Sequence, residues 1–519
     1  MLSCLDLEQP GRWRVLLIGS VALLVSTPTL LLFRRGMQGD LLGELAWGNA
    51  LESSLGLAAG VAGASFLLGW PLGSAAALYR FPARGLLLIM TSLPLLMPSL
   101  LLALGWSALS LATGLPPRGW LDGYVGCLVS FVASGLALVT LTALAAASAI
   151  PENQREAARL FGGERALLRN ALRSSLAPTA LAALLAGILT LSDPAPGQIF
   201  SQRTAAGAIL ESFAARNDLV LASRQSAALA LAALALSLPL LLASARGLAL
   251  LTLARSPRKA SLRSVAPASA TTTIGFLCVT TLLMLPAAGL TLPLWHAPST
   301  SLAGAFEAAF ARASDTALDS LGYALAAGAL SAGLALALAA AAGRSARLQG
   351  AVLALSVFLL AIPAAAPALG LASLAAAAPP WADPVLRGAL MVGVALGLRF
   401  LPVAALLMLR AWSSTAPGWF EVAALHGISL RAFAGSILLP ALAPGLLLSV
   451  ALVGLLAASD VVTVLLLHPP GRPSLALSIF TVMANAPEAT VAALCVVYGA
   501  AAGALVAAIA GRARALNRT

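Results

Sequence analysis

Long apolar runs, separated by segments with charged residues, proline and glycine, follow one another along this 519-residue chain. They constrain its fold more than any other feature. A transmembrane helix requires about 20 predominantly apolar residues, and most of the runs reach that length. Only 10% of the residues are charged, whereas soluble domains carry roughly 25%. The chain is therefore predicted to be an all-α polytopic membrane protein with about twelve transmembrane helices. The runs cover approximately residues 15–33, 55–79, 85–112, 124–149, 178–192, 220–245, 270–292, 321–342, 351–378, 389–411, 441–467 and 489–510.

The distribution of basic residues orients these helices. With the N-terminus placed inside, the cytoplasmic segments hold 21 of the 31 basic residues and the outside segments hold nine, while Arg399 alone falls within a span. Cytoplasmic loops of membrane proteins carry such an excess of arginine and lysine. Both termini are therefore predicted to face the cytoplasm, and we expect a multi-pass protein of the bacterial inner membrane.

The net charge of +12 does not indicate a nucleic-acid partner, because the basic residues follow the loops between the runs. The single lysine, Lys259, lacks the preceding glycine and the following serine or threonine of a phosphate-binding P-loop. The three histidines and four cysteines have no metal-ligand spacing. We therefore expect no catalytic residue, no metal and no cofactor held by this chain itself.

Three pairs of short motifs recur in the same order, at offsets of 266, 265 and 267 residues. They are Ser54-Leu55-Gly56 with Ser320-Leu321-Gly322, Glu156-Ala157-Ala158 with Glu421-Val422-Ala423, and Ser192-Asp193 with Ser459-Asp460. Collinear pairs at nearly one offset predict two homologous halves of six spans each. Because six is an even number, the halves insert with the same orientation, as parallel repeats about an axis along the membrane normal.

The repeat divides the chain into residues 1–258 and 259–519, with a basic linker over 255–263. The repeated cores cover about 51–250 and 316–511, so one additional span precedes each core. The linker is predicted to lie on the cytoplasmic side.

A distinctive loop follows the fourth span of each half, over residues 151–177 and 412–440. Each loop is predicted to form a short helix, a turn at a glycine, and a second helix that returns to the membrane. A glutamate near the start of such a helix suits the positive end of its dipole. The residues of interest are Glu156, Ala157, Ala158 and Gly162 in the first loop, and Glu421, Ala423, Gly427, Ile437, Leu439 and Pro440 in the second.

These loops resemble the cytoplasmic coupling loop of type I ABC importer permeases. The second copy matches that pattern apart from Val422, whereas the first departs from it at the three final positions, where Leu172, Ser174 and Ser175 stand. The resemblance implies the type I permease fold and a loop that docks on a separate ATPase subunit.

The resemblance also implies partners and a mechanism. A cytoplasmic ABC ATPase, in two copies for two loops, uses ATP, and an extracytoplasmic binding protein delivers the solute for transport by alternating access. Two permease halves in one chain, together with segments 465–471 and 399–402, look closest to the ferric-iron branch. Thiamine and aminophosphonate permeases remain alternatives.

Three ionisable residues lie within the spans or near their ends. Arg399 is in the middle of its run, while Asp193 and Asp460 occupy matching positions in the two halves. Ionisable residues inside a membrane are functional candidates, and these three are assigned to a translocation pathway between the halves. The alternative is a structural ion pair with aspartates that cap short helices. The sequence leaves open which aspartate pairs with Arg399.

A twelve-span secondary transporter of the major-facilitator type is the alternative function, since it also has two parallel six-span halves. Such proteins usually have an acidic and basic loop between their second and third spans. The corresponding segment here, residues 79–85, contains no acidic residue.

Overall fold

The computed structural model describes residues 11–36, 45–82, 84–113, 121–245, 266–267, 270–296, 298–416, 418–483 and 485–516. Nearly all of them are helical, and the described strands are a two-residue parallel pair, β1 (Tyr79–Arg80) with β2 (Ala266–Pro267). The predicted helical class is confirmed. The predicted linker over 255–263, and with it the boundary between the halves, lies outside the described residues.

Nine helices in the described part of the chain are long and apolar enough to cross a membrane. Two further pairs of helices count as spans if each bent pair is taken as one, which raises the number to 11. These helices confirm a polytopic membrane protein. The nine are α1 (Arg12–Gly36), α2 (Leu45–Leu78), α5 (Tyr124–Ser148), α6 (Glu152–Thr190), α9 (Leu219–Ala245), α11 (Ala270–His296), α12 (Ser299–Ala342), α16 (Ala389–Ser414), and α18 (Leu430–Phe433) continued by α19 (Leu439–Ala458).

The bent pairs occupy the third predicted run of each half. In the first half α3 (Arg84–Leu96) meets α4 (Ser99–Thr113) at 103°, and in the second α13 (Ala346–Ala361) meets α14 (Ala365–Ala377) at 82°. The fifth run, which is short in the sequence, is the apolar end of the 39-residue helix α6. The twelfth run lies in α22 (Glu488–Leu516), whose described apolar part is shorter than a full span.

One packing pattern occurs in both halves. The long helix α2 packs against α5 and α6, and the corresponding helix α12 packs against α16 and α19. The additional helices do not stay with their own halves. The helix α1 packs against α14, α12 and α9, whereas α11 packs against α4 and α3. Each additional helix therefore contacts the bent pair of the opposite half.

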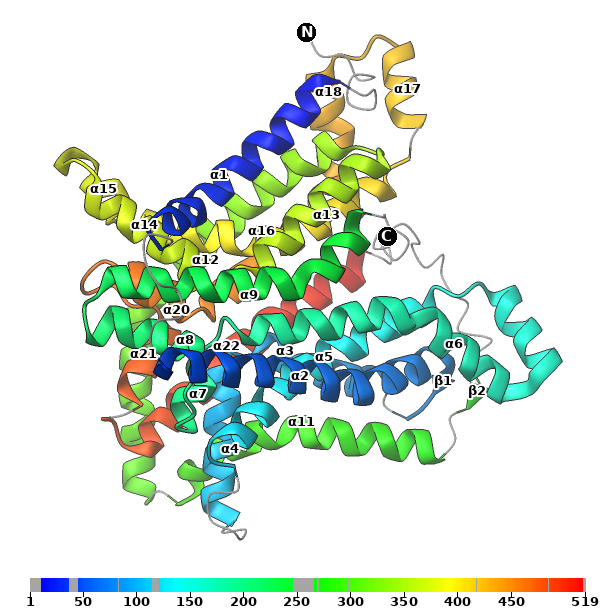
Figure 1. Ribbon diagram of the computed structural model, residues 1–519. Coiled ribbons are helices and arrows are strands. Elements are labelled where there is room, and N and C mark those ends of the chain that lie inside the picture. Colours follow the sequence, from blue (N-terminus) through cyan, green and yellow to red (C-terminus); the bar gives the residue numbers. More distant parts are fainter. Residues whose placement is uncertain are drawn as a thin grey trace.

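The two predicted cytoplasmic loops lie toward the same end of the bundle. In Figure 1 the loop within α6 lies at the right, near β1 and β2, α17 (Gly418–Leu425) lies at the upper right, and α18 lies beside α17 at the top. The helix α1 begins toward this end. Short helices mark the opposite end: α7 (Ala195–Ile199), α8 (Ala205–Leu210), α15 (Asp383–Leu386), α20 (Val462–Leu467) and α21 (Leu475–Val482).

The largest cluster of buried apolar side chains joins the halves. Most of its members belong to the second half, but Leu100, Leu101 and Ala195 of the first half lie in it together with Val461 and Val464. The residues that follow the bend of α3–α4 therefore pack into the same core as those around Asp460. This interface contains the polar network described below.

Candidate functional site

The first loop is an elbow within α6, where the helix breaks at Gly163. This residue has φ 63° and ψ −163°, a backbone conformation that glycine adopts at low cost. Gly162 keeps the helical path, and a Cβ atom added to it would lie 2.5 Å from the Cβ of Ala166. The prediction that Gly162 makes the turn is therefore wrong by one residue, because the positive φ falls at its neighbour.

The second loop is an elbow between α17 and α18, and its turn lies at the predicted glycine. Gly427 has φ 63°, and the N–H of Ile428 donates to the carbonyl of Ala423 at 2.9 Å, which closes the end of α17. The side chain of Ser429 then accepts from the N–H of Ala432 at 3.3 Å and begins α18.

The remaining motif residues of the second elbow lie on the returning helix. Ile437 belongs to a π-helical turn, η5 (Ala434–Leu438), and Leu439 and Pro440 begin α19. Ile437 and Leu439 are 38% and 43% exposed, whereas Leu438 between them is buried. Pro440 lies within the continuous helical path Leu430–Ala458, where a proline removes one backbone hydrogen bond, and the π-helical turn directly precedes it.

Each elbow has an exposed apolar tip. Leu160 and Phe161 are 83% and 92% exposed in the first elbow, and Leu425 is 84% exposed in the second. Glu156 and Glu421 are also exposed. Large apolar side chains gathered on an exposed segment are typical of interaction surfaces.

The alanines of the two motifs have different environments. Ala157 is exposed and Ala158 is partly buried, whereas Ala423 is 2% exposed. Ala423 therefore packs against its own elbow, and only the first-loop pair presents a small-residue surface.

The second elbow is attached to the bundle by aromatic packing. The ring of Phe420 lies 6.0 Å from that of Trp412 and 5.1 Å from that of Phe433, with an edge-on arrangement in the second pair. All three side chains are almost fully buried. Such aromatic pairs contribute beyond their buried area, so this elbow has a rigid apolar base.

The first elbow is attached by polar contacts instead. Glu164 accepts a hydrogen bond from the Tyr79 hydroxyl at 3.2 Å and pairs with Arg159, also at 3.2 Å. Burial, and secondly the charge of Glu164, raise the pKa of Tyr79, so the hydroxyl keeps the proton that it donates. Since Tyr79 pairs with Ala266 in the β1–β2 ladder, the chain that leads into α11 is connected to this elbow.

A buried ion pair lies between α16 and the start of α20. Arg399 Nη1 donates to the carboxylate of Asp460 and, at 3.0 Å, to Thr463 Oγ1. The same carboxylate accepts from the N–H of Thr463 at 2.7 Å. The side chains of Arg399 and Asp460 are 23% and 2% exposed. Asp460 is therefore the partner of Arg399, and it also caps a short helix.

The equivalent aspartate of the first half has different partners. Asp193 accepts from the Ser99 hydroxyl at the start of α4 and, at 3.0 Å, from the N–H of Ala195 at the start of α7. The residue 265 positions before Arg399 is Ser134, whose hydroxyl donates to the carbonyl of Pro94 at 3.1 Å. The helix-capping role is thus common to both aspartates, whereas the ion pair occurs in one half.

The structure brings the three predicted pathway residues together. Ala195, two residues after Asp193, belongs to the same buried cluster as Val461, which follows Asp460. The two aspartates therefore lie beside one core between the halves, where Arg399 pairs with Asp460 and Asp193 accepts from Ser99.

Two serines of the repeated motifs have a role that the sequence reasoning missed. Ser54 Oγ accepts from the N–H of Ala205 at 2.8 Å, and Ser320 Oγ accepts from the N–H of Leu475 at 2.8 Å. These N–H groups begin α8 and α21, two short helices at the end of the bundle opposite the elbows. The repeated motif that contains both serines, at an offset of 266 residues, indicates that they have equivalent positions.

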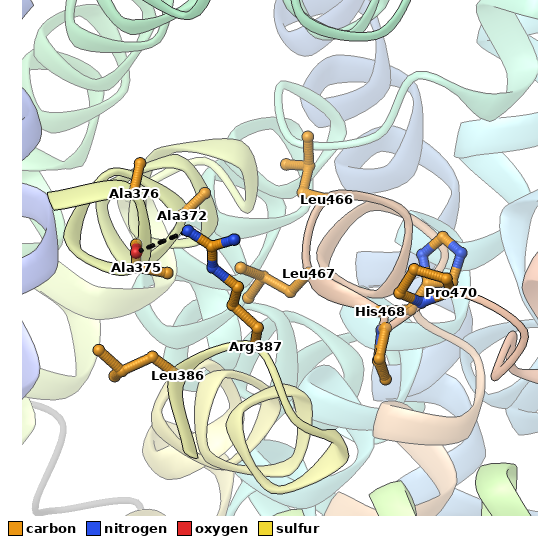
Figure 2. A pocket seen from close by; sticks show the side chains of 10 residues that line it. Ala372, Ala375, Ala376, Leu386, Arg387, Leu466, Leu467, His468 and Pro470 are labelled. Carbon is orange, nitrogen blue, oxygen red and sulfur yellow. Dashed lines mark hydrogen bonds between the residues drawn. The ribbon is translucent and has the colours of Figure 1, made fainter. Parts of the chain in front are cut away.

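A cavity of about 280 Å³ lies at the end of the bundle opposite the elbows, between α14, α15 and α20. Figure 2 shows the Arg387 side chain reaching across it to the carbonyl of Ala375, at 3.4 Å, with His468 at the far side. Apart from Arg387 and His468, the residues that line the cavity are apolar. No group of three or more His, Cys, Asp or Glu residues that could hold a metal occurs within the described ranges.

Comparisons of this chain with protein-family models, with curated proteins and with solved structures find no match.

Proposed function

We propose that this chain is the membrane-spanning permease subunit of a binding-protein-dependent, ATP-driven importer of the bacterial inner membrane. The observation that carries the proposal is the pair of elbows toward one end of the bundle (Figure 1). Each turns at a glycine with φ 63°, and each has an exposed apolar tip. A permease without a P-loop needs such docking surfaces, since a separate subunit binds and hydrolyses ATP.

The paired packing of the helices supports a duplicated architecture of twelve spans in two parallel halves. The contacts of α2 with α5 and α6 correspond to those of α12 with α16 and α19. Ser54 in α2 and Ser320 in α12 accept from the first N–H groups of the short helices α8 and α21, and Asp193 and Asp460 cap α7 and α20. We propose that both elbows face the cytoplasm and that both termini lie on the same side.

The elbows are the surfaces through which the proposed ATPase, in two copies, moves the spans. Glu156 and Glu421 lie exposed near the starts of the elbow helices, and Gly163 and Gly427 set the angle of each turn. Covering a phenylalanine such as Phe161 contributes about 1.5–3 kcal/mol. A contact that differs between the two ATPase states by part of this free energy shifts the halves between inward-open and outward-open forms.

The proposed substrate is ferric iron or a similar small solute, handed over by an extracytoplasmic binding protein. This proposal rests on the sequence of segments 465–471 and 399–402. Residues 465–471 lie at the outer end, beside the cavity of Figure 2. A major-facilitator transporter is disfavoured, because it needs no exposed docking elbows.

The experiment is co-expression with the ABC ATPase subunits of the source genome, followed by purification in mild detergent and measurement of ATP hydrolysis. We expect one ATPase to co-purify, and the double variant Phe161→Asn/Leu425→Asn to lose it. The matched control is Leu318→Asn, a substitution of a leucine that is 81% exposed in α12, outside the elbows. Normal co-purification and hydrolysis in the double variant would refute the proposed role of the elbows.

A further inference from the structure

We propose that Arg14, at the start of α1, is a positioning residue for the second elbow. Through this arginine, the additional helix of the first half fixes the place where an elbow of the second half leaves the bundle. The inference goes beyond the permease function, because it concerns a connection within this chain and does not require an ATPase.

Arg14 is buried to a degree that is unusual for an arginine. It is 1% exposed, whereas Arg12, two residues earlier in the same helix, is exposed. The guanidinium lies against Gly343, directly after the last residue of α12, where an added Cβ atom would lie 3.1 Å from both Nη atoms. The positive charge of Arg14 therefore lies at the C-terminal end of α12, which is the negative end of the helix dipole.

Gly343 belongs to a turn that is hydrogen-bonded to the root of the second elbow, residues 412–416. Its φ is 52°, and the absence of a side chain lets the guanidinium approach the backbone. Its carbonyl accepts from Gln349 Nε2 at 2.7 Å. The next residue, Arg344, donates to the carbonyl of Thr415 and, at 3.3 Å, to the hydroxyl of the same threonine. One turn therefore connects Arg14 to the root of the elbow.

The start of α1 also shares a buried core with the aromatic base of this elbow. Trp13 packs against the cluster of buried side chains that contains Trp412, Phe420 and Phe433. In Figure 1 the start of α1 lies at the same end of the bundle as α17 and α18. Loss of the Arg14 contact is therefore expected to act on the second elbow before it acts on the rest of the chain.

The first half has a corresponding arginine within its own sequence. Arg84 donates to the carbonyl of Ala76 at 2.9 Å, near the end of α2. The residue 266 positions after Arg84 is Gly350, so the second half has no arginine at the equivalent position. Arg14 instead supplies a positive charge at the end of α12, from the other half of the chain.

The test is hydrogen–deuterium exchange of the purified full chain in detergent, read separately over the second elbow, residues 418–433, and the first elbow, residues 156–170. We expect Arg14→Ala to raise the exchange rate of the second elbow several-fold and to leave the first elbow unchanged. The matched control is Arg12→Ala, which removes an exposed arginine from the same helix and should change neither elbow.

Two results of this experiment would overturn the proposal. The first is an unchanged exchange rate over the second elbow in Arg14→Ala. The second is an equal rise over both elbows, since Arg14 would then stabilise the whole bundle without positioning one elbow. Arg14→Lys keeps the positive charge at the end of α12, so we expect exchange close to that of the unmodified chain. Exchange as fast as in Arg14→Ala would overturn the role of the charge.

A reciprocal variant decides the proposal if Arg14→Ala does not fold. Arg344→Ala breaks the connection from the other side, at the root of the elbow, and leaves Arg14 in place. We expect faster exchange over the second elbow and also over residues 15–25 of α1, because the turn that carries Gly343 loses its attachment. Arg347→Ala, at an exposed arginine of α13, is the control. Continued protection of α1 in Arg344→Ala would overturn the connection.

Discussion

The carbonyl oxygen of Pro28 in α1 lies against Gly370 in α14, where an added Cβ atom would approach it to 2.1 Å. The additional helix of the second half makes a similar contact with the first half. The carbonyl oxygen of Pro286 in α11 would lie 2.0 Å from a Cβ atom on Gly105 in α4. Each additional helix therefore meets the bent pair of the other half at a proline–glycine contact. Glycine permits this approach because it has no side chain to separate the two backbones.

Gly105→Ala and Gly370→Ala are expected to destabilise the protein by about 1–3 kcal/mol each, because the added methyl group meets rigid backbone. Thermal unfolding of the purified protein in detergent measures the loss. Gly333→Ala in α12 is the control, since nothing lies within 4 Å of its added Cβ atom. Equal unfolding temperatures for all three variants would contradict these contacts.

Ser54→Ala and Ser320→Ala each remove the acceptor for the first N–H group of a short helix. A buried donor left without a partner costs about 1–3 kcal/mol. The loss is expected to be larger for Ser54→Ala, whose hydrogen bond is fully buried, than for Ser320→Ala, whose bond is partly buried. Unfolding temperatures test this order, and Ser314→Ala on the exposed face of α12 serves as reference.

Gly163→Val and Gly427→Val place a β-branched residue at φ 63°, which costs roughly 1–2 kcal/mol and changes the angle of the elbow. We expect normal membrane insertion with loss of the ATP hydrolysis that the permease stimulates in its partner. Gly435→Val is the matched control, because that glycine is helical and has open space around it. Full stimulation by the Gly427→Val protein would count against the elbow assignment.

The two elbows are expected to respond differently to loss of their attachments. Phe420→Ala empties the aromatic base of the second elbow, and a buried phenylalanine is worth about 3–5 kcal/mol. Tyr79→Phe removes one exposed hydrogen bond to Glu164, worth about 0.5–1.5 kcal/mol. Limited proteolysis should cut the second elbow rapidly in Phe420→Ala and leave the first nearly intact in Tyr79→Phe. If the mutated elbow were cut rapidly in both variants, or in neither, the difference between the aromatic and the polar attachment would be contradicted.

Features that depend on neighbouring residues were predicted well. The helical membrane class follows from the length of the apolar runs, and the turn at Gly427 follows from a glycine between two short amphipathic segments. The first elbow shows the limit of such local patterns: two consecutive glycines stand at the turn, and the positive φ falls on Gly163 instead of Gly162.

The sequence by itself determined that this chain is a helical membrane protein with matching motifs some 266 residues apart, because hydropathy and spacing are properties of adjacent residues. The tertiary structure alone decided that Arg399 pairs with Asp460, that Asp193 binds Ser99, and that α1 and α11 pack on the opposite halves. These contacts join residues that are at least 60 positions apart in the sequence. They depend on how whole helices pack, and equivalent aspartates in two similar halves are distinguished only by the neighbours that this packing supplies.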